Sequence, residues 1–128
     1  MAPTAILAKQ HLDNFNKLFE KYNIRCELLV SNITKKQKEK ILEELKNGNI
    51  DVIIGTHALL EENVEFKNLG LVVTDEQHRF GVRQRGKLSA KGLAPDVLAL
   101  SATPIPRTLA LILYGDLDIS IIDELPPN

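Results

Sequence analysis

A short apolar segment that stops at four consecutive polar side chains constrains the fold of this chain more than any other feature. Residues 69–74 read Leu-Gly-Leu-Val-Val-Thr, and Asp75, Glu76, Gln77 and His78 follow directly. Such a segment is typical of a strand that is buried within a parallel sheet. The polar side chains would then lie at the carboxyl end of the strand, where open α/β sheets bind their ligands.

The two adjacent carboxylates have a defined chemical use at such an edge. Asp75 would hold Mg²⁺, directly or through water, and Glu76 would orient or deprotonate an attacking water molecule. A solvated turn is the simpler interpretation, because a strand followed by Asp-Glu is a short and common pattern. A magnesium-dependent hydrolase built on this pair is a further alternative, although other acidic residues are not expected at the same edge.

Predicted strands and helices alternate along the rest of the chain. Thr34 and Gln37 match a capping box ahead of one helix, and Asn23 and Gly48 are expected to end helices. This alternation predicts an α/β fold in which helices cover both faces of a parallel sheet. The expected helices are 5–22, 35–47, 57–62 and one that ends near 114, and the expected strands are 24–30, 51–55, 69–74, 96–100 and 117–122.

The residues that follow the other predicted strands are polar as well, and a parallel sheet would place them at the same edge. Thr4 and Thr56 each precede a helix, whose free N–H groups and partial positive charge suit a phosphate. Two such sites would hold successive phosphates of a nucleic-acid strand without reading its bases. Ordinary helix caps are the alternative interpretation. The other polar residues of this set are His57, Ser101 and Thr103.

A basic segment begins directly after Glu76. Residues 78–87 contain four Lys or Arg residues, no acidic residue and one aromatic residue. This composition suits contact with nucleic-acid phosphates and stacking on bases, and a solvated surface turn is the alternative. The basic residues are Arg79, Arg83, Arg85 and Lys87, and the aromatic residue is Phe80.

The overall composition limits the class of protein. The formal net charge is −1, so any nucleic-acid site must be a local patch. Cys26 is the single cysteine, and the three histidines do not have the spacing of a metal motif. No apolar run approaches the ~20 residues of a membrane span, and the first residues lack the pattern of a signal peptide. We therefore expect a cytoplasmic protein without a membrane partner.

Together these motifs resemble those of superfamily 2 helicases. Asp75-Glu76-Gln77-His78 is similar to the DExH box, and Ser101-Ala102-Thr103 is similar to motif III. Met1-Ala2-Pro3-Thr4 with Gln10-His11 resembles motif Ia, and Ile54-Gly55-Thr56-His57 resembles motif Ib. The longer runs 75–85, 102–110 and 114–118 resemble bacterial double-strand DNA translocases. Transcription-repair coupling factors share much of this pattern, but the run 122–127 is more similar to the group that reverses stalled replication forks and migrates Holliday junctions.

The resemblance implies a fold, cofactors and partners. The fold would be a three-layer RecA-like (P-loop NTPase-like) α/β domain, in which helices flank a parallel sheet. ATP and Mg²⁺ would be the cofactors, forked or branched double-stranded DNA the partner, and the bacterial nucleoid the location. Asp75 and Glu76 would be the magnesium-site and water-activating carboxylates. Gln77, His78, Ser101 and Thr103 would couple the nucleotide to DNA. The DNA-binding residues would be Pro3, Thr4, Gln10, His11, Gly55, Thr56, His57, Arg79, Phe80, Arg83, Arg85 and Arg107.

One departure from the helicase pattern is large. No Gly-x-x-x-x-Gly-Lys-Ser/Thr sequence occurs in these residues. We therefore expect residues 1–128 to be part of a first motor domain, truncated before its P-loop strand, with 124–128 beginning the linker to a second motor domain. The wedge domain and the second motor domain would be partners from the same longer chain, and the isolated chain is expected to lack ATPase activity. The alternative is a non-catalytic α/β module that binds nucleic acid.

Overall fold

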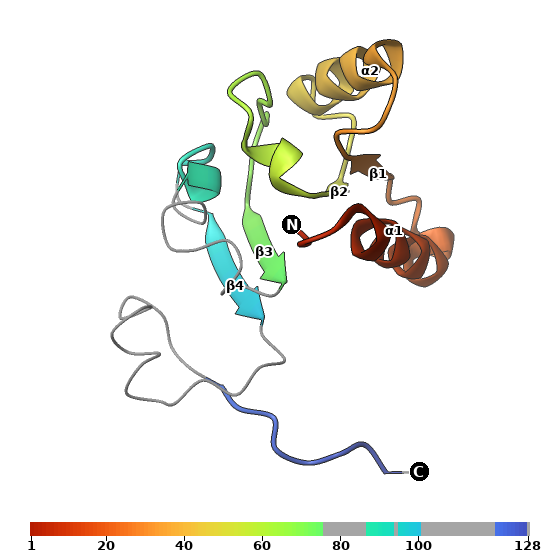
Figure 1. The fold of residues 1–128 in the computed structure, drawn as a ribbon, viewed down its shortest axis with the longest axis vertical. Coiled ribbons are helices and arrows are strands. Elements are labelled where there is room, and N and C mark those ends of the chain that lie inside the picture. Colours follow the sequence, from red (N-terminus) through yellow and green to blue (C-terminus); the bar gives the residue numbers. More distant parts are fainter. Residues whose placement is uncertain (76–86, 94, 101–119, 128) are drawn as a thin grey trace.

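The computed structural model describes residues 1–75, 87–93, 95–100 and 120–127, and its helices and strands alternate as the sequence predicts (Figure 1). The helices are α1 (Ala5–Phe19) and α2 (Lys35–Lys46), with 3-10 helices η1 (Glu20–Tyr22) and η2 (His57–Leu60). The strands are β1 (Cys26–Leu29), β2 (Val52–Gly55), β3 (Leu71–Asp75) and β4 (Asp96–Leu100). Among the described residues, no helix is long and apolar enough to cross a membrane.

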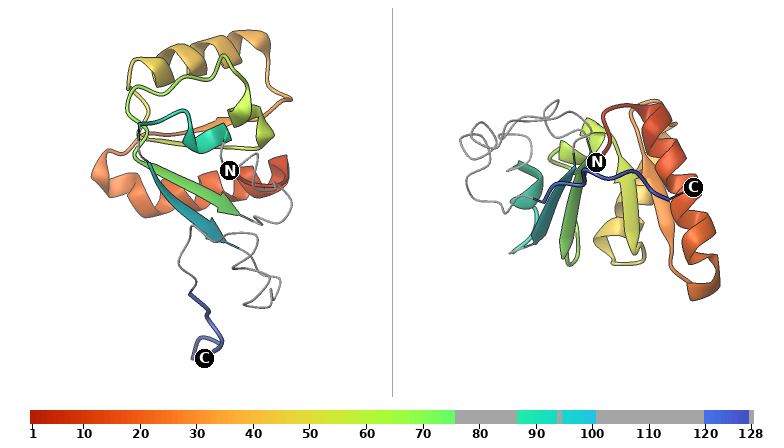
Figure 2. Two further views of the ribbon diagram at one scale, coloured as in Figure 1. Left: turned by 90° about the vertical axis from the view of Figure 1, so that its left-hand side faces the viewer. Right: turned by 90° about the horizontal axis from the view of Figure 1, so that it is seen from below.

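The four strands form two parallel pairs, and no ladder joins one pair directly to the other. β1 pairs with β2 in the register Cys26↔Val52, and β3 pairs with β4 in the register Leu71↔Asp96. The strands follow one another in the order β4, β3, β2, β1, and the amino terminus lies between β3 and β2 (Figure 2, right). The predicted parallel arrangement is confirmed within each pair.

The main chain of the first two residues joins the two strand pairs. The Met1 amine donates to the Val73 carbonyl at 2.6 Å, and the Asp75 N–H donates to the Met1 carbonyl at 2.9 Å. The Ala2 N–H donates to the Gly55 carbonyl at 2.8 Å. We call these three hydrogen bonds the seam. Because they follow the pattern of a parallel ladder on the β3 side, residues 1–2 continue the sheet between β2 and β3.

Helices α1 and α2 cover opposite faces of the β1–β2 pair. Neighbouring strand residues point to opposite faces, and Leu28 and Leu29 accordingly belong to two different apolar clusters. The first cluster holds Leu29 with Ile41, Leu42 and Leu45 of α2. The second holds Leu28 with Leu7, Ala8, Leu12 and Phe15 of α1. The two helices therefore give this half of the molecule the expected three layers.

The β3–β4 pair is covered on one face. Val72 and Thr74 are buried, at 3% and 0% exposure, and Val72 packs in the same cluster as Leu29. The side chains that alternate with them are more open, and the exposed fractions of Leu71, Leu98 and Leu100 are 60%, 49% and 44%. The alternation follows from the two-residue period of a strand. In the described residues, this face of the pair is left open.

Several helix ends were predicted from capping residues. The structure confirms the capping box before α2 and the two residues expected to end helices. The Thr34 hydroxyl accepts from the Gln37 N–H, and the Gln37 side chain accepts from the Thr34 N–H, which completes the capping box. Asn23 and Gly48 have left-handed φ values of 56° and 79°, the conformation that terminates helices. The first helix was predicted to run to residue 22, but its α-helical part ends at Phe19 and continues as η1.

Two predicted elements lie largely outside the described residues. The helix expected to end near 114 falls wholly within 101–119, which is not described. The strand expected at 117–122 is described only at 120–122, and those residues are in no strand. Of the other strands, β4 has the predicted bounds, β1 and β2 are shorter than predicted, and β3 begins two residues later and ends one residue later than predicted. These shifts arise because the pairing of main chains decides where a strand begins and ends.

A substitution at Gly55 tests the close contact between β1 and β2. A Cβ atom added at Gly55 would lie 2.2 Å from the main-chain oxygen of Leu29, whereas one added at Gly70 would meet nothing within 4 Å. We expect Gly55→Ala to lower the free energy of unfolding by about 1–3 kcal/mol or more, since a backbone atom cannot move aside cheaply. Gly70→Ala is the matched control. Equal urea midpoints for the two variants would contradict this packing.

Candidate functional site

The seam brings the predicted site residues to one edge of the molecule. Thr4 follows residues 1–2, Thr56 follows β2 and Asp75 ends β3, and the main chains of these three segments are hydrogen-bonded to one another. Because the segments run parallel, their carboxyl ends meet at the same edge. β4 ends at Leu100, which pairs with Asp75. The structure therefore places Thr4, Thr56 and Asp75 at one edge, as the sequence predicts.

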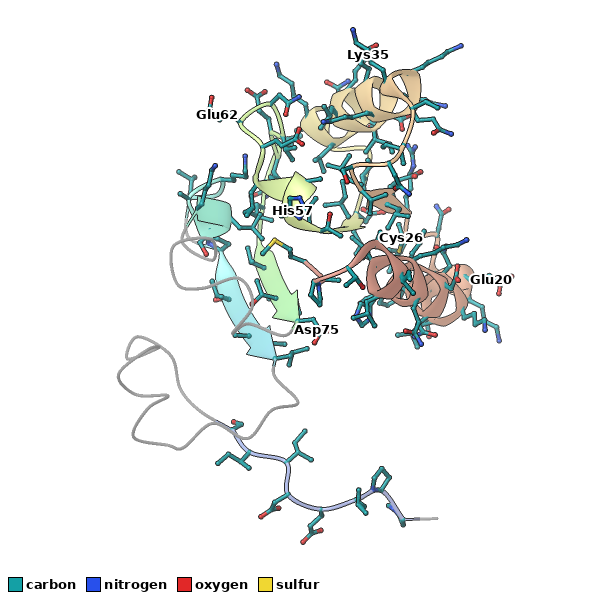
Figure 3. The ribbon with its side chains drawn as sticks, in the orientation of Figure 1. Glu20, Cys26, Lys35, His57, Glu62 and Asp75 are labelled. Carbon is teal, nitrogen blue, oxygen red and sulfur yellow. The ribbon has the colours of Figure 1, made fainter. Side chains whose placement is uncertain are left out.

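Asp75 lies at the centre of this edge, at the end of β3 (Figure 3). Its main-chain N–H is held by the Met1 carbonyl, and its side chain is 27% exposed. The carboxylate oxygen Oδ2 lies 3.0 Å from Nε2 of His11 on α1. A carboxylate only accepts hydrogen bonds, so His11 Nε2 must carry the proton of this bond. Asp75 is thus fixed from the main chain on one side and from α1 on the other.

Thr4 is the N-cap of α1 and remains exposed. Its extended backbone, with φ −135° and ψ 156°, lets its hydroxyl oxygen accept from the Leu7 N–H at 3.2 Å. A threonine hydroxyl that accepts in this way still has its own proton to donate. The other N–H groups of the first turn have no partner within the helix, and no acidic side chain lies in that turn. The start of α1 can therefore receive a phosphate oxygen.

The residues around the end of β2 differ in how accessible they are. Gly55 is buried against β1, and its carbonyl accepts the seam hydrogen bond from Ala2. Thr56 is only 5% exposed, and its carbonyl accepts from the Leu59 N–H within η2. His57 is exposed at the start of η2 (Figure 3). In this structure His57 offers side-chain surface to a ligand, whereas Thr56 offers little.

Pro3 and Gln10 complete the predicted residues that the structure describes. Pro3 is half-buried beside the seam, and Gln10 is exposed on α1 next to His11. The remaining predicted site residues lie outside the described residues: Glu76, Gln77, His78, Arg79, Phe80, Arg83, Arg85, Ser101, Thr103 and Arg107.

Sequence reasoning missed two features of this edge. The seam depends on main-chain atoms of Met1 and Ala2, for which side-chain patterns give no signal. His11 was assigned to DNA, but the structure places it against Asp75, 64 residues away in the chain. Helical spacing alone could have shown that His11 lies two turns beyond Thr4, although it could not have identified the partner.

A divalent metal ion would find one protein ligand in the described part of this edge. Within the described residues, no three His, Cys, Asp or Glu side chains gather as a metal site. The Asp75 carboxylate is a hard oxygen donor of the kind Mg²⁺ prefers, and its second oxygen is not used by His11. Mg²⁺ commonly takes one or two carboxylates together with substrate phosphates and water. Asp75 fits that limited role.

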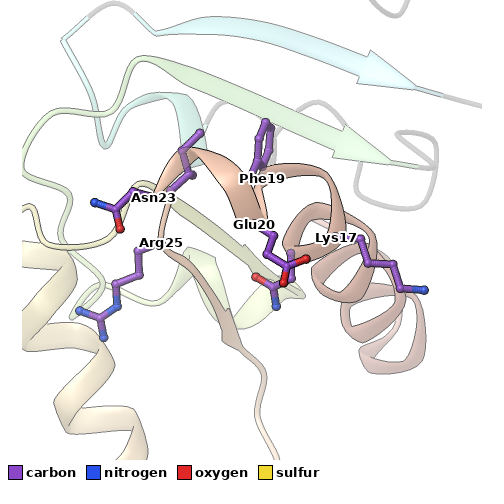
Figure 4. A pocket seen from close by; sticks show the side chains of 7 residues that line it. Lys17, Phe19, Glu20, Asn23 and Arg25 are labelled. Carbon is purple, nitrogen blue, oxygen red and sulfur yellow. The ribbon is translucent and has the colours of Figure 1, made fainter.

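One hollow of the described surface lies away from this edge (Figure 4). It has a volume of about 620 Å³ and is lined by residues from the end of α1 to the start of β1, including Lys17, Phe19 and Arg25. These residues precede β1, so they lie toward the amino ends of the parallel strands. None of the predicted site residues lines this hollow, so we do not assign it to the candidate site.

Comparison with known proteins defines the class of protein first. The family model of DEAD/DEAH box helicases matches residues 1–112. The chain belongs to this family, which confirms its resemblance to superfamily 2 helicases and the predicted RecA-like α/β fold.

The more specific similarity is to RecG. The chain is 58% identical to the ATP-dependent DNA helicase RecG of Thermotoga maritima over 128 residues, and 56% identical to that of Bacillus subtilis over 126 residues. These matches cover 100% and 98% of this chain, but only 16% and 18% of the two relatives. A solved structure of RecG bound to a three-way DNA junction matches with a TM-score of 0.78 and 54% identity, covering 99% of this chain and 17% of that one.

These relatives confirm the narrower resemblance as well. The sequence favoured one group of DNA translocases over transcription-repair coupling factors, and these similar relatives are RecG helicases. The chain spans less than a fifth of the length of these relatives.

In a chain that is made to start at Met1, the free amine of this residue makes the stability of the seam dependent on pH. Burial lowers the pKa of this amine from 8.0 to about 6, against the opposing effect of the Asp75 charge. Between these values the unfolded chain binds a proton that the folded chain does not. We therefore expect the free energy of unfolding to fall as the pH is lowered from about 8 to about 6, and to change little further from this cause.

The measurement is urea unfolding of the chain that begins at Met1, at several pH values between 6 and 8. The matched control carries an acetylated amino terminus, which keeps an N–H for Val73 but cannot be protonated. An identical pH dependence in both forms would show that other groups are responsible.

Proposed function

We propose that this chain forms part of the ATP-driven motor of a bacterial DNA helicase that translocates on double-stranded DNA. Residues 1–128 would be a partial first RecA-like domain, with 124–128 beginning the linker to a second motor domain. The observation that carries this proposal is the placement of Asp75 and the start of α1 at one sheet edge, joined by the seam. A nucleotide ligand and a DNA contact would thereby share one rigid support.

The carboxylates would do the nucleotide chemistry at this edge. Asp75 would hold Mg²⁺, with its free carboxylate oxygen turned to the metal, and Glu76 would orient and deprotonate the attacking water. When bound with ATP, Mg²⁺ neutralises charge on the phosphates. Gln77, His78, Ser101 and Thr103 would transmit the nucleotide state toward DNA. Membership of the DEAD/DEAH box helicase family and similarity to ATP-dependent DNA helicases support the use of ATP.

The DNA contacts would be made mainly to phosphates. The exposed Thr4 hydroxyl and the first turn of α1 provide donors, and His57 provides an exposed side chain at the next segment. Such contacts position a strand without reading its sequence. We assign the remaining DNA-contacting roles to Pro3, Gln10, Gly55, Thr56, Arg79, Phe80, Arg83, Arg85 and Arg107.

The biological setting follows from the same proposal. Forked or branched double-stranded DNA would be the substrate, and the protein would act in replication-fork reversal, Holliday-junction branch migration, recombination and repair. The similarity to a RecG that was solved on a three-way DNA junction supports this substrate. A wedge domain and a second motor domain of a longer chain would be its partners. We propose a cytoplasmic, nucleoid-associated location, without a membrane partner.

The salt dependence of DNA binding tests the assignment of the basic segment. We expect the isolated chain to bind DNA weakly and without sequence preference, because Arg79, Arg83, Arg85 and Lys87 offer at most four phosphate contacts. The slope of log K against log salt should then be no steeper than about −4. Replacing Arg83 and Arg85 by alanine should make it shallower by about 2. Tight binding at physiological salt, or an unchanged slope in the double variant, would contradict the assignment.

A substitution at Glu76 tests the catalytic assignment in the full-length protein that carries these residues. Glutamine keeps the shape of glutamate but cannot accept a proton, so we expect Glu76→Gln to bind ATP and to lose DNA-stimulated ATP hydrolysis by about 10²-fold or more. The control is Glu62→Gln, the same change at an exposed residue far from this edge. Normal hydrolysis in Glu76→Gln would remove this role from Glu76.

A further inference from the structure

The contact between His11 and Asp75 links two parts of the site that the sequence assigns to different ligands. His11 belongs to α1, whose start is the proposed DNA contact, and Asp75 is the proposed metal ligand. Their side chains meet at 3.0 Å between Nε2 and Oδ2, with exposed fractions of 38% and 27%. This side-chain hydrogen bond joins α1 to β3.

The bond determines how the Asp75 carboxylate is turned. The main chain of Asp75 is held by the Met1 carbonyl, but that contact leaves the side-chain torsions free. His11 fixes them, because its N–H occupies Oδ2 and leaves Oδ1 as the oxygen that a metal can take. Hydrogen bonds of this kind to a ligating carboxylate orient the ligand and raise metal affinity.

The position of His11 is in turn set by α1 as a rigid body. Ala8 is fully buried, and Leu7, Leu12 and Phe15 pack with it against β1 and β2. His11 follows Thr4 by two helical turns, roughly 10 Å along the helix axis. A shift of the start of α1 on binding a DNA phosphate would therefore be carried to His11 and, through its hydrogen bond, to the Asp75 carboxylate.

We propose that His11 is a positioning residue for Asp75, through which DNA contact at the start of α1 is coupled to the orientation of the metal ligand. His11 acts on the carboxylate and not on a DNA phosphate, which replaces the DNA-binding role predicted from the sequence. This inference rests on the proposed function, because it takes Asp75 as a metal ligand and the start of α1 as a DNA contact.

Two amide substitutions test the proposal in the full-length protein that carries these residues. The amide nitrogen of His11→Gln can reach the place of Nε2, whereas that of His11→Asn is one methylene shorter and cannot reach Oδ2. The control is Asn14→Ala, which removes an exposed polar side chain from the next turn of α1. Three quantities are measured: Mn²⁺ affinity by electron paramagnetic resonance with a non-hydrolysable ATP analogue, DNA-stimulated ATP hydrolysis with varied Mg²⁺, and affinity for forked DNA.

We expect His11→Asn to weaken Mn²⁺ binding by about 10-fold or more and to raise the Mg²⁺ concentration for half-maximal hydrolysis similarly. Its affinity for forked DNA should stay within about twofold of the original, because no phosphate contact is lost. His11→Gln should recover most of the metal affinity, and Asn14→Ala should match the unchanged protein in all three measurements.

Other outcomes would overturn the proposal. A loss of DNA affinity with unchanged metal binding would make His11 a DNA contact. Equal behaviour of the two amide variants would show that the hydrogen bond does not position Asp75. A loss of the folded state in His11→Asn alone, seen by thermal unfolding, would make the bond structural. Absence of DNA-dependent ATP hydrolysis in the unchanged protein is a separate result, which would overturn the proposed function itself.

Discussion

The seam is the interaction on which the rest of this structure depends. Each strand pair is held by its own ladder, but a two-stranded sheet is marginal alone. The main chain of Met1 and Ala2 connects Gly55 at the end of β2 to Val73 and Asp75 in β3. Without these hydrogen bonds, the edge that carries Thr4, Thr56 and Asp75 would be two separate edges. The proposed site is therefore a product of main-chain pairing as much as of its side chains.

The sequence predicted local structure best where the signal lies within a few neighbouring residues. The capping box of Thr34 and Gln37 and the left-handed residues Asn23 and Gly48 were identified because their chemistry is complete within a few residues. The division into two strand pairs was not predicted, because strand pairing is a contact between distant segments. Hydrophobic periodicity identifies strands but does not specify their neighbours.

The same distinction applies to the candidate site. The position of Asp75 after a buried strand was predictable from the abrupt change from apolar to polar residues, and the structure places it at the end of β3. The burial of Thr56 was not predictable, since its sequence pattern resembles that of the exposed Thr4. The contact of His11 with Asp75 spans 64 residues and involves two residues that the motifs treat separately. Sequence motifs indicate which residues belong to the site, whereas tertiary contacts determine which of these residues touch one another.

The seam also has a consequence for the order in which the chain folds. Met1 and Val73 are 72 residues apart, whereas the paired residues Cys26 and Val52, or Leu71 and Asp96, are separated by far shorter loops. The entropy cost of closing a loop rises with its length, and distant contacts slow folding. The strand pairs can form first, each with its covering helices or loops, and the seam closes last. We therefore expect the site edge to form late in folding, after the contacts within each strand pair.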